Sequence, residues 1–397
     1  MRNQWSAFEQ LSDCRLDFEL EAFELHALYD ALFEQKRIAS GDFDLVLLNT
    51  DWVAAAHATG CVLNLATRIT ENPPEGYPDG WTQSLLRLQS IDGVILGVPY
   101  HDGPECLIIR RDLFQGEKWQ REYADKFGTT LRVPETWEEF HQVARFFHRP
   151  DEGLWGTAFA GFPDCHNTVY DFMLQLWTRG GELVDESGRV RFYSPQAVAA
   201  LEFYRAIMQD REAVHPDSLQ FDSVQLGQAF ANGQIAMMVN WFGFAAWAET
   251  SPGSRVRGRI DLAPVPHAPG CNSASLSIYW LLAIAAGCPR PELAYLFLRH
   301  CVSPSMDRLL TLEGAVGCRK STWSDVEVCS VAPHFNLLEP LHAHARELPR
   351  LAEWPSIATL IDAFVRASAV TQDPIEELLM EADAKLAKGK TSPVRGS

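Results

Sequence analysis

Short apolar segments of strand type alternate with longer amphipathic segments of helix type along nearly the whole chain, and this alternation is the strongest constraint on its fold. Near the N-terminus, apolar positions recurring every third residue predict a helix over 3–14, and strict alternation predicts a strand over 15–22. A second amphipathic helix over 25–33 precedes the apolar run Phe43–Leu48. This order is typical of an α/β fold with parallel strands.

The same alternation continues to the C-terminus. Strands are predicted over 91–99, 106–110, 154–159, 233–239, 262–266 and 277–286. Helices are predicted over 137–147, opened by Thr136 as N-cap with Glu139, then over 168–178, from Ser194-Pro195 onward, over 291–301, over 304–311, and over 355–387 with a break near Asp373-Pro374. Because 397 residues exceed one compact core, two or three domains are expected.

Composition excludes several classes of partner. There are 34 basic residues against 52 acidic ones, a formal charge of −18, without a basic cluster, so binding to nucleic acid is not expected. The nine cysteines form no C-x-x-C pair, which predicts neither a metal cage nor a disulfide framework. Sequence motifs for dinucleotide, P-loop, zincin and nucleophile-elbow chemistry are missing. We therefore expect no catalytic activity, no metal and no cofactor.

Two histidine-containing pairs were considered as chemical sites. His342 and His344 are two residues apart and do not share a helix face, which predicts surface histidines rather than metal ligands. His101-Asp102 lies in a turn between two predicted strands. This pair could be an oriented base or simply two ligand contacts.

Several motifs in order resemble one known family. They are Ser40–Val46, Gly93–Tyr100, Arg110–Leu113, Pro134–Glu139, Gly180–Asp185, Ser194–Ala197, Ala200–Tyr204, Phe230–Met237 and Tyr279–Ile284. Together they resemble the extracellular solute-binding proteins, family 1, of ABC importers, the group that includes maltose-binding protein. One motif departs from the family pattern, because Ile278-Tyr279 replaces a glycine pair.

The resemblance implies a fold and a function. It implies a two-lobed periplasmic-binding-protein-like fold of type II, with hinged α/β domains and a ligand cleft. The expected lobes are 1–101 with 265–312, and 102–264 with 313–388, followed by a disordered tail over 389–397. The function it implies is capture of a small polar solute, a sugar or oligosaccharide, for an ABC permease, by a monomer that closes about its hinge.

The N-terminus departs from this resemblance. Members begin with a signal peptide and an apolar first strand, whereas Met1–Leu20 has no apolar h-region. Either the start lies upstream, or the sheet is built without that strand. The resemblance implies a periplasmic or cell-surface location, and a cytoplasmic location stays open.

The candidate ligand contacts lie beside loops at the ends of predicted strands, where α/β sheets bind ligands. Flat aromatic rings stack on sugar faces, and polar side chains meet sugar hydroxyls. The aromatic candidates are Trp52, Tyr100, Trp241, Tyr279 and Trp280. The polar candidates are Asp51, His101, Asp102, Asp164, His166, Asn167, Asn240 and Arg319.

Two other classes of function stay open. A carbohydrate-active enzyme would use Asp102 and Asp164 as acid and base, and would need their carboxyl groups about 5 to 10 Å apart. A cytoplasmic ligand sensor of the same fold would account for the N-terminus and the nine thiols.

Overall fold

The computed structural model describes residues 1–12, 16–351 and 353–389, and these form two compact units. Unit 1 comprises Met1–Pro104 and Ser277–Ala352, and unit 2 comprises Glu105–Leu276 and Glu353–Ser397. Each unit is therefore built from two separate stretches of chain. Compared with the expected lobes, residues 102–104 and 313–352 lie in unit 1, and residues 265–276 lie in unit 2.

Unit 1 contains a three-stranded sheet in the order β1 (Leu45–Asn49), β9 (Trp280–Ile284), β4 (Val98–His101). Strand β9 is antiparallel to both neighbours. The expectation of parallel pairing is wrong here, since the central position is taken by a strand from late in the chain that runs the other way. A short hairpin of β2 (Ser90–Ile91) and β3 (Val94–Ile95) precedes β4.

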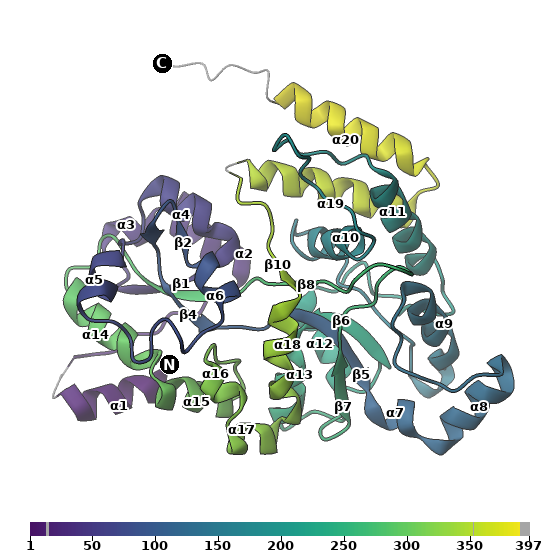
Figure 1. The fold of residues 1–397 in the computed structure, drawn as a ribbon, viewed down its shortest axis with the longest axis horizontal. Coiled ribbons are helices and arrows are strands. Elements are labelled where there is room, and N and C mark those ends of the chain that lie inside the picture. The colour runs from purple at the N-terminus through teal and green to yellow at the C-terminus, as the bar shows by residue number, and fades with distance from the viewer. Residues whose placement is uncertain (13–15, 352, 390–397) are drawn as a thin grey trace. The chain divides into compact units, whose positions relative to one another are not determined.

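Helices surround this sheet (Figure 1). Their bounds are α1 Arg2–Ser12, α2 Leu25–Tyr29 continued by a π-helical turn over Asp30–Glu34, α3 Arg37–Ser40, α4 Val53–Thr59, α5 Ala66–Glu71, α6 Gln83–Leu88, α14 Pro291–Cys301, α15 Pro304–Leu312, α16 Lys320–Trp323, α17 Val326–Val331 and α18 Leu338–Ala343. A 3₁₀ turn over Thr50–Trp52 joins β1 to α4, another over Pro333–Leu337 precedes α18, and strand β10 (Ala345–Arg346) follows it.

Asp307 explains why residues after 312 belong to unit 1. It lies buried in α15, and its two carboxylate oxygens accept backbone N–H groups from Cys318 at 2.8 Å and Arg319 at 3.3 Å. These bonds satisfy a buried charge that would otherwise be costly. They hold Cys318 and Arg319 against α15, and the chain that follows α15 belongs to unit 1.

The predicted strand over 15–22 does not form. Residue 15 lies outside the described part, and residues 16–24 belong to no helix or strand. A strand is defined by its hydrogen-bonded neighbour, and no described strand lies beside this segment. The alternation of apolar and polar residues over 15–22 is thus not accompanied by hydrogen-bonded pairing with a described strand.

Unit 2 contains a second three-stranded sheet, in the order β6 (Met237–Trp241), β5 (Glu105–Arg110), β7 (Ile260–Ala263), again with antiparallel pairs. The predicted strand over 106–110 is confirmed, and all six residues of β5 are buried. The predicted strand over 154–159 is reduced to single bridges from Leu154, Trp155 and Thr157. Strand β8 (Ser275–Leu276) ends the first stretch of this unit.

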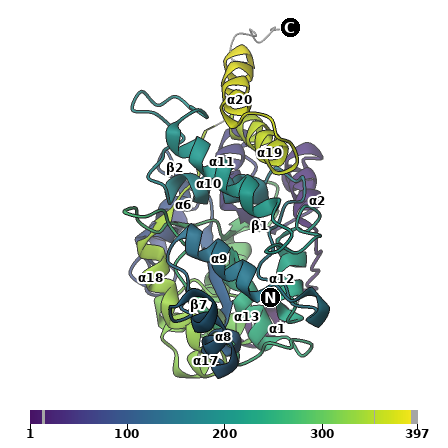
Figure 2. The ribbon, with the colours of Figure 1, turned by 90° about the vertical axis from the view of Figure 1, so that its right-hand side faces the viewer.

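The helices of unit 2 cover most of its chain. They are α7 Arg111–Gln115, α8 Glu117–Phe127, α9 Trp137–Phe147, α10 Asn167–Trp177, α11 Pro195–Met208, α12 Ser223–Ala231, α13 Phe242–Thr250, α19 Trp354–Val370 and α20 Ile375–Gly389, with a 3₁₀ turn over Pro150–Glu152. The last two pack with α10 and α11 as one group of helices (Figure 2). The break near Asp373-Pro374 is confirmed, and the predicted tail beyond Gly389 lies outside the described residues.

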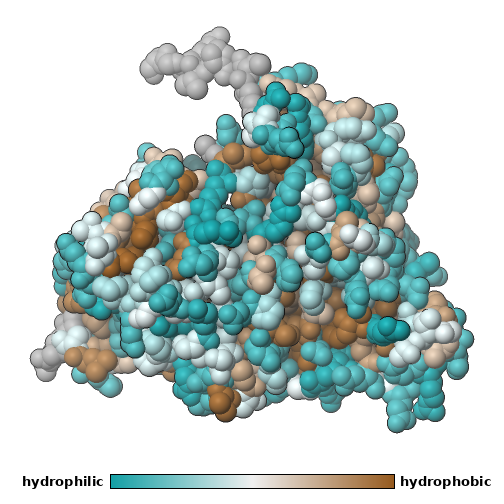
Figure 3. Space-filling view, viewed as in Figure 1, coloured by the Kyte–Doolittle hydropathy of each residue, from teal (hydrophilic) through white to brown (hydrophobic). Residues whose placement is uncertain are grey.

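On the face drawn in Figure 3, hydrophilic residues predominate and hydrophobic ones gather in separate patches. Among the described residues, no helix is both long and apolar enough to cross a membrane.

The N-terminus of α9 supports a stability prediction. Thr136 accepts a hydrogen bond from Glu139 N–H at 3.2 Å, and the Glu139 carboxylate accepts one from Thr136 N–H, as the capping box predicted. Thr136→Ala removes one of these bonds and is expected to lower the free energy of unfolding by about 1 kcal/mol. Urea denaturation measures this, with the exposed Thr130→Ala as control, which is expected to change little.

Candidate functional site

In unit 1, three side chains form a row across one end of the sheet. Asn49 at the end of β1 pairs in register with Trp280 at the start of β9, and Trp280 pairs with His101 at the end of β4. Asp51 and Trp52 follow in the turn after β1. The Trp52 ring packs edge-on against Trp280, with centroids 5.7 Å apart. The sheet thus brings together four of the predicted contacts: Asp51, Trp52, His101 and Trp280.

His101 is held in a defined protonation state. Its Nδ1 accepts the backbone N–H of Val316 at 3.1 Å, which leaves the proton of a neutral imidazole on Nε2. Burial lowers the pKa of His101, and the charge of Asp102 only partly opposes this. A neutral His101 can therefore donate one hydrogen bond through Nε2.

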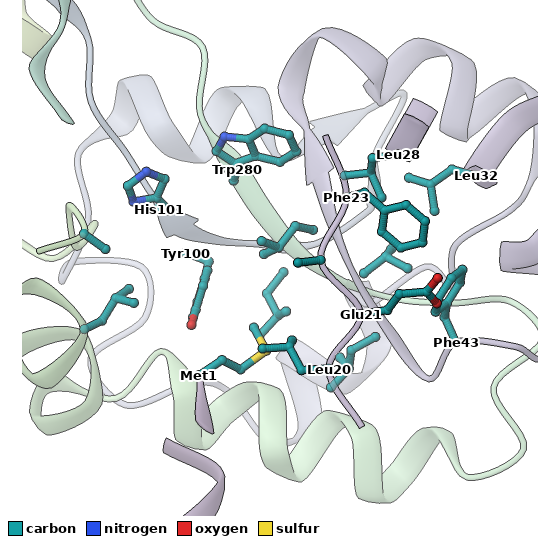
Figure 4. A pocket seen from close by; sticks show the side chains of 17 residues that line it. Met1, Leu20, Glu21, Phe23, Leu28, Leu32, Phe43, Tyr100, His101 and Trp280 are labelled. Carbon is teal, nitrogen blue, oxygen red and sulfur yellow. The ribbon is translucent and has the colours of Figure 1, made fainter. Parts of the chain in front are cut away.

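His101 and Trp280 line one end of a cavity of about 470 Å³ inside unit 1. Figure 4 shows these two rings on one side of the cavity, with Phe23, Leu28 and Phe43 on the other. Most of the lining side chains are apolar, and the polar ones include His101 at one end and Glu21 beside Phe43 at the other.

Three other predicted contacts, Tyr100, Tyr279 and Arg319, make hydrogen bonds within unit 1. The buried Tyr100 hydroxyl donates to Gln4 Oε1 at 2.7 Å, and the buried Tyr279 hydroxyl donates to the carbonyl of Leu85. Arg319 donates to the carbonyls of Val302 and Glu75, each at 2.8 Å, while its guanidinium lies 4.3 Å from the Trp81 ring centroid. In this structure these polar groups are directed at the protein itself.

Asp102 is paired with His342. Its Oδ2 lies 2.6 Å from His342 Nε2, and both side chains are almost fully buried. The other ring nitrogen, Nδ1, lies 3.0 Å from Ser84 Oγ. The prediction of a surface histidine at 342 is therefore wrong, because spacing on a helix does not reveal a partner from a distant strand, while His344 is exposed as predicted.

In unit 2, the corresponding sheet end carries Trp241 and Asn240, at the end of β6. Trp241 is half-buried, and Tyr170 packs edge-on against it at 5.5 Å. Asn240 is buried, where its amide donates to the carbonyl of Ser223 at 3.0 Å and its side-chain oxygen accepts Trp241 N–H at 2.8 Å. Asn240 thus orients the strand end that presents Trp241.

The three remaining candidates begin α10. The Asp164 carboxylate accepts the backbone N–H groups of His166 at 2.8 Å and Asn167 at 3.2 Å, and also the Asn167 amide at 2.8 Å. His166 Nδ1 lies 2.7 Å from the carbonyl of Asp164. These contacts hold the three side chains together in one turn. Tyr170, which touches Trp241, follows one helical turn later and places this group near β6.

Glu105, which sequence reasoning missed, stands beside Trp241. It begins β5 and pairs directly with Trp241 across the two strands. The residue is 5% exposed, and its Oε2 has no hydrogen-bond partner among the described residues. Burial, together with the charge of Asp171, raises the pKa of Glu105 well above its ordinary value. Its position at the first residue of a buried strand was the available signal.

Asp171 adds a second enclosed carboxyl group. Burial raises its pKa to about 8, partly offset by Tyr204, and its Oδ2 likewise lacks a partner among the described residues. With a pKa of about 8, Asp171 is mostly protonated at pH 7, and burial shifts Glu105 toward its protonated form. A neutral carboxyl group can both donate and accept hydrogen bonds.

Among the described residues of each unit taken by itself, no three His, Cys, Asp or Glu ligand atoms gather closely enough to hold an ion. The eight cysteines in the described part are all free.

The fold and the chemistry of these sheet ends suit a protein that binds a small molecule, and proteins similar to this chain belong to one such class. The maltose-bound MalE3 of T. maritima superimposes with a TM-score of 0.83 at 23% identity, covering 98% of this chain and 95% of that one. The ribitol complex of an ABC transporter solute-binding protein from Agrobacterium radiobacter K84 gives 0.84 at 22% identity, covering 98% and 94%. The mannitol-binding protein of Pseudomonas aeruginosa is 23% identical over 381 residues, 89% of this chain and 80% of that protein.

Residues 27–307 match the family of bacterial extracellular solute-binding proteins. The match spans more than half of the chain, and the chain belongs to this family. It is a solute-binding protein of the ABC importer class.

The raised pKa of Asp171 predicts a pH-dependent stability. Between the unfolded value of 3.8 and the folded value of about 8, the folded state binds more protons, so stability falls as pH rises through this window. Asp171→Asn keeps the shape of the neutral acid and cannot ionise. Between pH 5 and pH 8, the stability of the variant should therefore rise relative to that of wild type. The difference in the free energy of unfolding should grow by at most about 1.4 kcal/mol per pH unit.

Thermal unfolding at both pH values measures the difference. The exposed Asp125→Asn is the matched control and should follow wild type. An equal shift of both variants would contradict a special environment at Asp171.

Proposed function

We propose that the solute is a neutral sugar or polyol and that the chain binds it without chemical change. The observation that carries this proposal is the repeated arrangement at the two sheet ends. Trp280 stands beside His101 in unit 1, and Trp241 stands beside Glu105 in unit 2. Each end offers an aromatic ring next to a polar side chain. Glu105 has a carboxyl oxygen without a hydrogen-bond partner among the described residues, and the ring of His101 is oriented by its bond with Val316.

The chemistry of these groups favours a neutral ligand rich in hydroxyls. Indole rings stack on the apolar faces of sugar rings or polyol chains. The Nε2–H of His101 donates to a hydroxyl oxygen. Burial shifts Glu105 toward its protonated form, which both donates and accepts hydrogen bonds. A cationic ligand would instead require an ionised carboxylate, which burial of Glu105 disfavours.

Relatives support the same class of solute. Proteins of similar fold are described with maltose and with ribitol, and a sequence relative is described as mannitol-binding. The remaining predicted contacts, Asp51, Trp52, Asp164, His166 and Asn167, are proposed to meet further hydroxyl groups. Tyr100, Asp102, Asn240, Tyr279 and Arg319 are proposed to act mainly by holding these contacts in place.

We further propose that the protein acts as a monomer and delivers the solute to ABC permease subunits. A ligand shifts a conformational equilibrium only by its difference in affinity for the two states. Solute binding is therefore expected to favour one arrangement of the two units, which the permease recognises. Small-angle scattering with and without solute measures that change.

The enzyme alternative loses its proposed acid and base. The Asp102 carboxylate is buried against His342, and Asp164 accepts backbone N–H groups just before α10.

The proposed function is tested by isothermal titration with mannitol, ribitol, maltose and tagatose, followed by recovery of the solute. Saturable binding with the solute recovered intact supports the proposal, and turnover or failure to bind any neutral sugar or polyol would overturn it.

Trp241→Ala is expected to weaken solute binding about 10-fold or more, because burying a large apolar side chain contributes about 1.5–3 kcal/mol. Trp247→Ala is the matched control in the same unit, since Trp247 lies in α13 and is 37% exposed. Its affinity should stay near wild type. Equal solute affinities for the two variants would show that Trp241 does not contribute to solute binding.

A further inference from the structure

His101, the polar contact proposed for the solute in unit 1, is held by the backbone of Val316. Val316 N–H donates to His101 Nδ1 at 3.1 Å, and the Val316 carbonyl accepts Asp102 N–H at 2.8 Å. These bonds tie the last residue of β4 and the residue after it to one distant segment. Because Nδ1 accepts, a neutral His101 carries its proton on Nε2. The direction of this donor therefore depends on where Val316 lies.

The segment that carries Val316 is fixed through its next residue. Gly317 N–H donates to Thr311 Oγ1 at 3.0 Å, and the Gly317 carbonyl accepts Trp323 Nε1–H at 2.7 Å. Thr311 belongs to α15 and Trp323 to α16, and both are buried. The helices on either side of the segment thus hold it in place.

His342 joins this segment to Asp102. The imidazole stacks on the indole of Trp323, with centroids 5.2 Å apart and planes 8° apart, and its Nε2 lies 2.6 Å from Asp102 Oδ2. These contacts close on themselves, and we call them the Val316 network. Its members are Asp102, Val316, Gly317, Trp323 and His342.

Asp102 depends on His342 for its place in the Val316 network. The Asp102 side chain is buried, and its Oδ1 has no hydrogen-bond partner among the described residues. The contact with His342 through Oδ2 therefore carries the pairing of this carboxylate, and Ser84 Oγ, 3.0 Å from His342 Nδ1, turns the imidazole toward it. Leaving a buried carboxylate unpaired is costly. Without a donor from His342, Asp102 is expected to turn toward water and draw its N–H away from Val316.

We propose that His342 is a positioning residue for solute binding. Acting through Asp102 and Val316, it fixes the tautomer and direction of the imidazole that meets the solute. The His342 side chain is 2% exposed, so it acts from within unit 1 rather than by touching the solute. The inference rests on the proposed function, in which His101 Nε2–H donates to a solute hydroxyl.

The first test needs no solute. In protein labelled with ¹⁵N-histidine, the chemical shifts of the ring nitrogens report which one carries the proton, and the His101 signals are those lost in His101→Gln. Burial lowers the pKa of His101, so its ring is neutral at pH 8. Wild type should show a protonated Nε2 and an unprotonated Nδ1. In His342→Asn, the signals should move toward the average of the two tautomers.

The two amide variants of His342 differ in which ring nitrogen they replace. The Asn amide takes the place of Nδ1 and cannot reach Asp102, whereas the longer Gln amide takes the place of Nε2 and can donate to Asp102 Oδ2. His342→Gln should therefore keep the wild-type signals of His101. His344→Gln, at an exposed residue of the same segment, is the control and should match wild type.

Trp323→Phe opens the Val316 network at a second place. Phenylalanine keeps a ring against His342 but cannot donate to the Gly317 carbonyl. The His101 signals should move in the same direction as in His342→Asn. This variant carries the test if His342→Asn does not fold.

The second test measures solute affinity by isothermal titration with mannitol, ribitol, maltose and tagatose. His342→Asn should weaken binding of the solute that wild type binds by about 10-fold, the effect of losing one directed hydrogen bond. His342→Gln and His344→Gln should stay within about threefold of wild type.

Two results would overturn the proposal. One is unchanged His101 signals in both His342→Asn and Trp323→Phe. The other is an equal loss of affinity in His342→Asn and His342→Gln, which would assign His342 a role in stability alone. Failure of wild type to bind any sugar or polyol would instead overturn the proposed function, and the His101 signals would still show whether His342 fixes the tautomer.

Discussion

The central position of β9 is the constraint on which unit 1 depends. Without it, β1 and β4 would have no common neighbour, because each pairs only with β9 in the three-stranded sheet. The strand comes from residue 280 onward, so the sheet closes only after the chain has passed through unit 2. The same pairing sets Asn49, Trp280 and His101 in one row. The candidate site is therefore a direct consequence of a long-range backbone register.

Buried carboxyl groups differ in how far their oxygens are satisfied. Both oxygens of Asp307 accept backbone N–H groups. Asp102 pairs with His342 through Oδ2, while its Oδ1 has no partner in the described chain. Glu105 and Asp171 likewise each keep an enclosed oxygen without a partner there. An unmet polar group of this kind costs free energy in the folded protein. Under the proposed function, a solute hydroxyl beside Trp241 supplies the missing bond of Glu105.

Local signals in the sequence predicted the helices well. Pro291 and Pro304 begin α14 and α15 at the residues expected, and the capping box of α9 forms as predicted. Strands were predicted less well, because pairing is not local. Residues 16–22 alternate as a strand should and yet have no neighbour, and residues 154–159 make only isolated bridges. The relative direction of neighbouring strands also cannot be read from local patterns, and β9 is antiparallel to both its neighbours.

The candidate site shows the same limit. Trp241 and Trp280 are predicted contacts because the family resemblance sets both near strand ends, and in the structure Trp241 ends β6 and Trp280 begins β9. Tyr279 stands next to Trp280 in the chain, but its hydroxyl turns to Leu85, and only the packing of α6 decides this. Glu105 lies just before the predicted strand over 106–110 and carries no prediction, and His342 is predicted on the surface. In both cases a partner from a distant segment, Trp241 or Asp102, determines the role of the residue.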